Sequence, residues 1–552
     1  MRMQDPPHWF LVCVALLASA SPAMAQAHEH EAAAPPAVLY QGMGNAHHPV
    51  KTGDPQAQAF FDQGMNFLWG FNHDEALRSF QRAAELDPRM AMAQWGIAYS
   101  VGPNYNLPVD EQRELQAYEA IQKAVALSRD GPASERAYID ALAKRYTNDP
   151  KGDLMPLAVA YSNAMRELMK RYPDDLDAAT LFAESMMDQR PWKLWNADGT
   201  PAPGTEETVA TLESVLRRDP THIGANHFYI HAVEASRNPE RALPSANRLA
   251  ALAPGAGHLV HMPAHIYIRT GFQEQASDTN KKAAAADEAF LQQSHEQGIY
   301  PMMYFSHNLH FIAVTNATMG NYQEAMAAAR KLQEHVGPHV KEMVMLDGFN
   351  AVPFQIMVRF QRWDEILKLD QPDPSHPVSL GMWFYARGMA FAARGNEKQA
   401  RNELNGLNKI TPEIAKIPTN PVGPGNAQKM PQIGRHMIEA RIAQQKKDYA
   451  TAVLHLRAAA TLEDSMDYTE PPDWIAPVRE SLGAVLLAGG NPQEAERVFR
   501  EDLEQHPRNP RSLFGLMQAL KAQGKEEDAA AVSRQFEANW KNADSKLDMS
   551  QM

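Results

Sequence analysis

The sequence predicts an all-α solenoid, a fold in which pairs of helices stack one after another along the chain. Apolar residues make up 44% of the 552 residues, which is enough for a continuous core. Helical runs alternate with short turns, and one arrangement of a small residue, a turn, an alanine and a proline occurs near both ends of the chain. Such a repeated pattern indicates units that bury their apolar faces against their neighbours.

The first residues have the parts of a secretory signal peptide. Arg2 supplies a positive charge, a short apolar run follows, and Ala23 and Ala25 provide the small residues of a cleavage site. We expect residues 1–25 to be removed after Ala25, which would place the mature protein in the periplasm or outside the cell. No later stretch reaches the roughly 18 apolar residues that a membrane-spanning helix needs, so no integral membrane segment is expected.

Composition narrows the classes of ligand. Cys13, the only cysteine, lies within the predicted signal peptide, so disulfides and thiolate ligands are excluded from the mature chain. Any transition metal must then be held by His, Asp, Glu or Met. The formal charge of −13 disfavours nucleic acid and anionic membranes, because both bind concentrated Lys and Arg. A neutral or cationic ligand is easier to accommodate.

The first clear helix pair follows a leader. Residues 26–52 are rich in Ala and Pro and lack a helical period, which predicts a flexible leader whose histidines are solvated or capture metal weakly. In the next segment Gly64 lies midway along a helical run, Ala76 opens a second helix and Pro88 closes it. With Phe80, these residues resemble the tetratricopeptide repeat family, whose 34-residue unit is a pair of antiparallel helices.

The resemblance extends over most of the chain. Gly483, Ala495 and Phe499 repeat the same spacing near the C-terminus. NHFYIHAVEAS, HMPAHIYIRTG and YFSHNLHF are similar to stretches in a group of exported bacterial tetratricopeptide repeat (TPR) proteins. The resemblance implies a right-handed α-solenoid of about eight to ten tetratricopeptide-type helix pairs over residues 53–540, with a concave groove lined by the first helices. The segment near 190–204 departs from the unit and predicts an insertion, and 541–552 is expected to be a disordered tail.

Histidines gather at the groove positions of three consecutive units. Repeat positions 2, 5, 9 and 12 share one face of the first helix, and in the family that face, with position 13, lines the groove. The three units offer fifteen such positions, where the average His frequency of the chain predicts about 0.6 histidines, and seven are found. The seven are His227, His231, His258, His261, His265, His307 and His310.

This clustering predicts a histidine-rich groove that binds a transition metal. First helices of neighbouring units lie roughly 8–10 Å apart, so their imidazoles can converge on one ion. Imidazole ligands without thiolate suit Zn, Cu or Fe, and the sequence leaves the identity of the metal open. The alternatives are a polar groove that binds a ligand without metal, and no specific site.

Carboxylates and aromatic residues nearby would complete the site. Glu234, one turn beyond His231, and Glu184, at a groove position of an earlier unit, are candidate catalytic bases, ligands or acceptors for an imidazole; otherwise each is a solvated acid. The segment 468–479, with Tyr468 and Glu470, and the insertion are candidate caps over the groove. Candidate substrate contacts are Asp188, Tyr304, Asn308, Arg190 and Trp192.

Three functions remain open on the sequence. The first is a metal site used for metal binding or for metal-dependent chemistry on a small substrate. The second is a scaffold without catalysis, in which the groove binds a peptide or the tail of a partner protein. The third is a pH sensor whose imidazoles charge together near pH 6. An enzyme should show a closed, capped pocket, whereas a scaffold should show an open groove.

Overall fold

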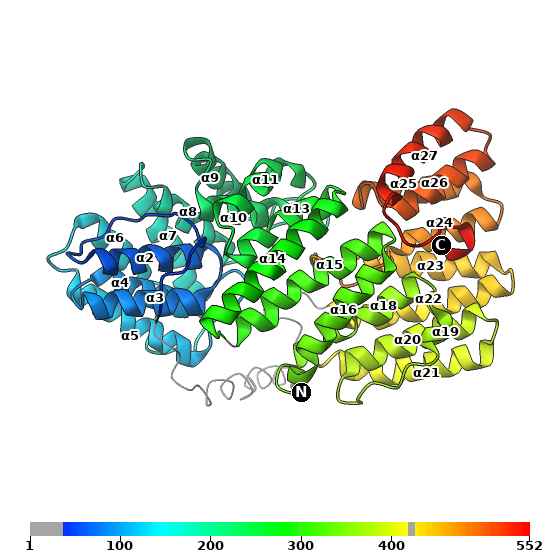
Figure 1. Cartoon of the computed structure of the whole chain (residues 1–552), viewed down its shortest axis with the longest axis horizontal. Coiled ribbons are helices and arrows are strands. Elements are labelled where there is room, and N and C mark those ends of the chain that lie inside the picture. The colour runs from blue at the N-terminus through cyan, green and yellow to red at the C-terminus, as the bar shows by residue number, and fades with distance from the viewer. Residues whose placement is uncertain (1–36, 297, 418–425) are drawn as a thin grey trace, which may run out of the picture.

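The computed structural model describes residues 37–296, 298–417 and 426–552, and every regular element in these ranges is helical. The predicted signal peptide and the first part of the leader lie outside the described residues. The predicted all-α class is confirmed: consecutive helices pack as antiparallel pairs, and the pairs stack on one another (Figure 1).

The N-terminal half of the solenoid lies on the left of Figure 1. Its helices are α2 (Pro55–Trp69), α3 (His73–Leu86), α4 (Ala91–Val101), α5 (Glu111–Leu127), α6 (Ala133–Leu142), α7 (Met155–Arg171), α8 (Leu176–Met187), α9 (Thr205–Arg218), α10 (Ile223–Glu234), α11 (Leu243–Leu252), α12 (Gly257–His261), α13 (Pro263–Arg269) and α14 (Gln273–Ser294).

The C-terminal half continues to the right of Figure 1 and begins with a π-helical turn over Pro301–Phe305. Its helices are α15 (Ser306–Met319), α16 (Tyr322–Val336), α17 (Asp347–Asn350), α18 (Val352–Arg359), α19 (Trp363–Ile366), α20 (Pro377–Ala393), α21 (Glu397–Ile414), α22 (Met430–Gln445), α23 (Tyr449–Asp464), α24 (Val478–Ala488), α25 (Pro492–Gln505), α26 (Pro510–Ala522) and α27 (Glu526–Trp540).

Helix ends follow ordinary capping chemistry. Asp54, Asp110 and Asp175 precede α2, α5 and α8, and their carboxylates accept backbone N–H groups of the first turn. Gly320 ends α15 in the left-handed conformation, with a φ of 85°. These local signals set the boundaries between the paired helices.

The small residues of the repeat make room for a phenylalanine of the second helix. A Cβ on Gly64 would lie 2.6 Å from the ring of Phe80, and the same ring also fills the space beside Gly96 of the next first helix. Phe499 lies in the same way between Gly483 and Gly515, where a Cβ on Gly483 would be 2.5 Å from the ring. The spacing seen in the sequence therefore reflects one interlock used at both ends of the solenoid.

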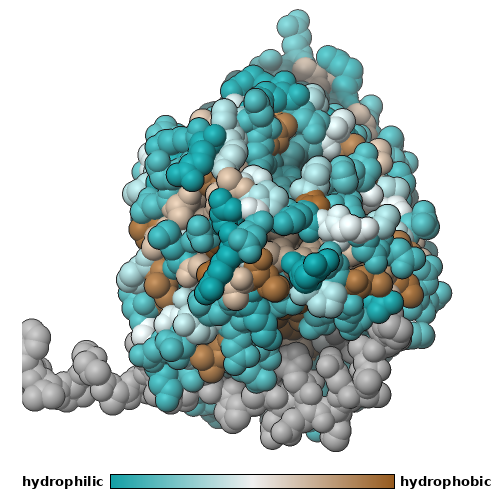
Figure 2. Space-filling view, turned by 90° about the vertical axis from the view of Figure 1, so that its left-hand side faces the viewer, coloured by the Kyte–Doolittle hydropathy of each residue, from teal (hydrophilic) through white to brown (hydrophobic). Residues whose placement is uncertain are grey.

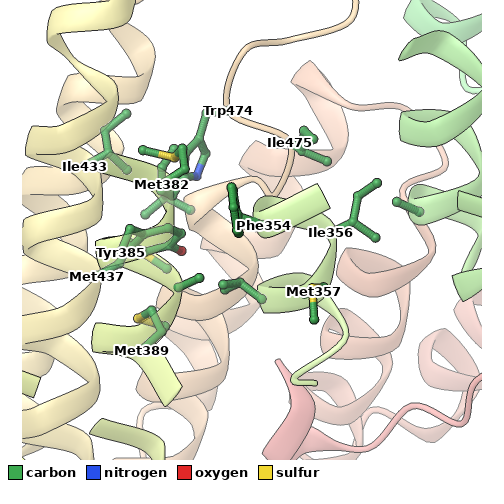
Figure 3. Packing of buried hydrophobic residues seen from close by; sticks show 14 of the residues in the cluster. Phe354, Ile356, Met357, Met382, Tyr385, Met389, Ile433, Met437, Trp474 and Ile475 are labelled. Carbon is green, nitrogen blue, oxygen red and sulfur yellow. The ribbon is translucent and has the colours of Figure 1, made fainter. Parts of the chain in front are cut away.

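The core divides into two main clusters, one in each half. Figure 3 shows part of the C-terminal cluster, where Trp474 and Ile475 lie beside Phe354 of α18 and Met382 of α20. Trp474 is buried and its ring packs against Tyr385 at 5.1 Å between centroids. The segment between α23 and α24 is therefore anchored in the core, and its preceding residues reach back toward α10.

Both ends of the described chain pack against the solenoid. In place of a flexible leader, Tyr40 donates its backbone N–H to Gln63, and Met43 is buried. In place of a disordered tail, Asp544 accepts the backbone N–H groups of Tyr322 and Gln323 at the start of α16. These two ends are poor in apolar residues, but they still pack against the solenoid, because helix ends and the edges of the core offer hydrogen-bond partners and apolar contacts.

The face of the molecule shown in Figure 2 is mainly hydrophilic. Figure 2 shows the end of the molecule formed by the N-terminal half, where apolar residues are scattered among polar ones. None of the helices in the described ranges combines the length and the apolar character needed to cross a membrane.

Candidate metal centre

Four helices bring the predicted histidines together between the two halves. Helix α10 carries His227, His231 and Glu234, and α15 carries two more histidines. The helix between them is divided at Met262, since Pro263 takes the first position of α13. Most of these imidazoles are almost completely buried, with His227 and His261 fully inaccessible.

The first triad consists of His227, His231 and His258. Each offers one ring nitrogen, and the three nitrogens lie within 4.8 Å of one another. The Nε2 atoms of His227 and His258 are 3.1 Å apart. Two nitrogens bound to one ion at about 2.0–2.1 Å in tetrahedral geometry would be about 3.3 Å apart, so this spacing fits a shared metal ion.

The second triad consists of His261, His265 and His307, with ligand nitrogens again within 4.8 Å of one another. The Nε2 atoms of His261 and His265 are 2.8 Å apart. The ring of His307 packs against that of His261 at 4.7 Å between centroids. The triads adjoin each other, because the centroids of His231 and His265 are only 5.6 Å apart.

A partner on the Nδ1 side fixes the tautomer of His261. Asn280 donates its Nδ2–H to the carbonyl of Ala276 at 2.7 Å, so its Oδ1 must accept the Nδ1–H of His261 at 2.6 Å. The Nε2 of His261 therefore carries a lone pair, and it lies 2.8 Å from the Nε2 of His265. The Nδ1 of His265 is 2.5 Å from a carboxylate oxygen of Glu234 but makes no hydrogen bond within the described residues.

The first triad is oriented in a similar way. The Nδ1–H of His227 donates to the carbonyl of Trp69 at 2.5 Å, and that of His231 donates to Glu234 at 2.8 Å. The Nε2 of His231 is buried and has no hydrogen-bond partner among the described residues. Carbonyl, amide and carboxylate partners that hold Nδ1 and leave Nε2 for the metal are the usual outer shell of histidine metal sites.

Glu234 connects the two triads, since its two carboxylate oxygens face His231 and His265. Burial by itself would raise its pKa, but the adjacent imidazoles of His265 and His231 lower the pKa below its usual range. The carboxylate is therefore ionised and places one negative charge between the six imidazoles.

Burial keeps the imidazoles themselves neutral. Desolvation and the neighbouring rings lower the pKa values of His227, His258, His261 and His307 well below the usual value. This is the opposite of what a sensor near pH 6 requires, so the structure argues against the third hypothesis. Neutral imidazole is the form that binds metal.

A chamber of about 330 Å³ adjoins the triads. His231, His258, His265 and His307 line one end, and Phe349, Val352 and Val378 of the C-terminal half line another part. Trp192 of the 190–204 insertion and residues 469–473 of the segment after α23 also contribute to its wall. Both segments expected to cap the groove therefore do so.

The predicted site residues separate into those at the centre and those elsewhere. The six triad histidines, Glu234, Tyr304 and Trp192 lie at the centre or line the chamber. Tyr304 packs against His258 at 4.7 Å between ring centroids. His310 lines the chamber beside Phe349 but belongs to neither triad.

The other predicted residues do not reach the chamber. Glu184 accepts a hydrogen bond from Tyr99, and Asp188 forms a 2.7 Å ion pair with Arg145, in a separate buried cluster beside α8. Arg190 is exposed. Asn308 donates to the buried Asp287 at 2.7 Å. Repeat register does not encode these partners, which hold Glu184, Asp188 and Asn308 outside the lining of the chamber.

Sequence reasoning missed the buried polar residues behind the site. Asn280, which accepts from His261, and Asp287, which accepts from Tyr300 and Asn308, lie seven residues apart on α14 and are fully buried. They share a face with Ala276, Ala283 and Phe290, all buried residues. Two polar residues on an otherwise apolar face were a usable signal, whereas the carbonyl of Trp69 left none.

No protein-family model matches the chain, and no curated protein matches it. Among solved structures, the chain is similar to a human IFIT1 dimer with m7Gppp-AAAA, at 14% identity over 90% of this chain and 92% of that one, with a TM-score of 0.32. It is also similar to yeast Tom70, at 14% identity over 89% and 92% of the two chains, with a TM-score of 0.30. Both scores are low, so no site is transferred from these proteins.

Proposed function

We propose that this chain is a helical-repeat protein that binds two transition-metal ions, one in each histidine triad, for metal-dependent chemistry on a small molecule in the adjoining chamber. The proposal rests on one observation above all. Ring nitrogens of His261, His265 and His307 converge within 4.8 Å of one another beside a second buried set of three, and the Nε2 atoms of His261 and His265 are 2.8 Å apart.

A metal ion satisfies this geometry better than a shared proton. A proton would join two imidazoles, whereas His307 adds a third nitrogen within 4.8 Å of both, and a second set of three is built beside it. Three neutral nitrogen ligands and an open position toward a chamber are typical of catalytic metal sites. Zn, Cu and Fe all suit such a donor set, and export of the protein remains a prediction from the signal-like sequence.

The size of the chamber favours chemistry on a small molecule over a scaffold function. A volume of about 330 Å³ suits a small molecule. Binding of a protein partner elsewhere on the solenoid stays a separate proposal without a defined surface.

Metal content tests the proposal directly. Untagged protein should contain about two equivalents of one transition metal by inductively coupled plasma mass spectrometry, and the double variant His261→Ala/His265→Ala should lose about one. A matched control is His436→Ala/His455→Ala, which removes another histidine pair with Nδ1 atoms 3.1 Å apart but without a third ligand. Equal, substoichiometric metal in all three proteins would contradict the proposal.

A further inference from the structure

The wall of the chamber holds several polar atoms without a partner. The Oε2 of Glu470, the Nε2 of His73 and the Oδ1 of Asn106 are buried and have no hydrogen-bond partner within the described ranges. All three residues line the chamber. Glu470 is 9% exposed and His73 is 6% exposed, so bulk water does not compensate them.

The atoms of His73 and Asn106 are acceptors, and the Oε2 of Glu470 is an acceptor when that carboxyl is ionised, against the burial that raises its pKa to about 7. His73 points its Nδ1 at the carbonyl of Ser100 at 3.1 Å, so the proton lies on Nδ1 and Nε2 carries a lone pair. Asn106 uses its Nδ2 to donate to Tyr304 at 3.2 Å, which leaves Oδ1 as the acceptor. A buried acceptor without a donor costs about 1–3 kcal/mol, so a ligand that supplies O–H or N–H groups would be favoured here.

Much of the remaining wall is apolar and aromatic. Phe71 and Tyr304 line the chamber beside the triads, and Phe349, Val352 and Met345 line it from the C-terminal half. Aromatic rings of a ligand pack well on such surfaces, at offset or edge-to-face angles. The chamber therefore fits a molecule with an apolar body and a small number of hydrogen-bond donors.

Charge narrows the class of ligand further. Glu470, Asp74 and Asp473 line the chamber and disfavour a carboxylate ligand, while Arg113 already donates to the carbonyls of Val101 and Ser100. Metal ions in the triads would disfavour an ammonium group at the other end. A neutral ligand avoids both penalties.

We propose that the chamber binds a small neutral aromatic alcohol or phenol, with its hydroxyl group bonded to Glu470 and its ring against the apolar wall. This inference rests on the proposed function, because the metal centre forms one end of the chamber. It assigns the substrate class of that centre.

Calorimetric titration with three probes of similar shape tests the inference. 4-Ethylphenol should bind at least about 10-fold more tightly than ethylbenzene, which lacks the donor, because one good hydrogen bond is worth about 1.4 kcal/mol. It should also bind more tightly than 4-ethylbenzoate, which carries a charge. Equal binding of 4-ethylphenol and ethylbenzene, preference for 4-ethylbenzoate, or no binding of 4-ethylphenol would each overturn the inference.

Two variants locate the binding. Glu470→Leu should reduce the preference for 4-ethylphenol to less than about 3-fold, whereas Asp467→Leu, which changes an exposed acid of the same segment, should leave it intact. An undiminished preference in folded Glu470→Leu would overturn the role of Glu470. The metal content of each preparation separates the two proposals. Binding of 4-ethylphenol to protein without metal would contradict only the proposed function. Metal in the protein without binding of 4-ethylphenol would contradict only this inference.

Discussion

Two carboxylates in this protein each hold two imidazoles, in opposite surroundings. Glu234 lies 2.8 Å from His231 and 2.5 Å from His265, and all three side chains are 1% exposed. Asp177 lies 2.6 Å from His48 and 3.0 Å from His222, and its side chain is 21% exposed. The same arrangement of groups serves different purposes at the two places.

The remaining ring nitrogens explain the difference. Around Glu234, the Nε2 of His265 lies 2.8 Å from that of His261, the Nε2 of His231 has no hydrogen-bond partner among the described residues, and burial lowers the pKa of His231. Around Asp177, the Nδ1 of His222 already accepts the backbone N–H of Ala225, and the hydrogen bond to Asp177 raises the pKa of His48 against the opposing effect of burial. A buried carboxylate thus orients neutral ligands, whereas the more exposed one forms a charged clasp that holds the leader.

Exchange of each carboxylate for its amide should show the largest difference between the two places. In Glu234→Gln the amide can accept one Nδ1–H at most, so one imidazole of the two triads loses its acceptor and the charge between them disappears. Loss of such an outer-shell partner typically costs 10–100-fold in metal affinity. Competition titration with a chelator should therefore show weakened binding at both triads.

The matched control is Asp177→Asn, which removes the carboxylate of the clasp. It should leave metal affinity at the two triads unchanged, because both imidazoles at Asp177 lie outside them, and any metal lost from the separate group of His48, Asp175 and Asp177 would leave both triad steps of the titration in place. If both amide variants lose metal equally, or if neither does, then the idea that Glu234 orients metal ligands while Asp177 only holds the leader is wrong.

A smaller effect should distinguish the triads from each other. Asn280→Ala removes the acceptor of His261 and leaves the first triad untouched. The metal affinity of the second triad should therefore fall by roughly 10-fold, while that of the first triad stays the same. In the same chelator titration, the two metal ions should then be removed in two separate steps, where the unaltered protein loses them in steps of similar affinity. Uniform weakening of both steps would show that the triads act as one unit.

The sequence predicted the fold well, because repeat spacing is local information. Gly64, Phe80 and Ala76 report one interlock that recurs, and the interlock determines how consecutive units stack. The register also placed the triad histidines on one face of consecutive first helices. That much follows from spacing alone.

The division into two triads and the outer shell could not be predicted in the same way. Whether imidazoles focus on one point or two depends on the break at Met262 and on side-chain rotamers, which spacing does not encode. The hydrogen bond from His227 to the carbonyl of Trp69 joins residues 158 positions apart. Glu184 and Asp188 were misplaced for a related reason, since Tyr99 and Arg145, from units nearer the N-terminus, bind them away from the chamber.

The smallest predicted effect concerns the clasp and its dependence on pH. Because the pKa of His48 is raised in the folded protein, its contribution is fully present below the usual value of about 6.5 and is lost as the pH rises through the folded value. Burial opposes ionisation of Asp177, but bonds to His222 and His48 lower its pKa, so its contribution is present above about 3.9 and is lost at acid pH. The clasp should be strongest between these limits.

Hydrogen exchange can measure the clasp without disturbing the metal centre. At pH 5.5, His48→Gln should reduce the protection of the backbone amides of Ala46 and His48 by about 1–2 kcal/mol, the worth of a charge-assisted hydrogen bond. At pH 8.5 the difference between the variant and the unaltered protein should be smaller, because the charge on His48 is lost as the pH rises through its raised pKa. Equal protection at pH 5.5 would mean that the bonds to Gln58, Asp62 and Asn66 hold the leader by themselves. In that case the imidazoles at Glu234 would depend on their carboxylate, whereas the leader would not need the bond between Asp177 and His48.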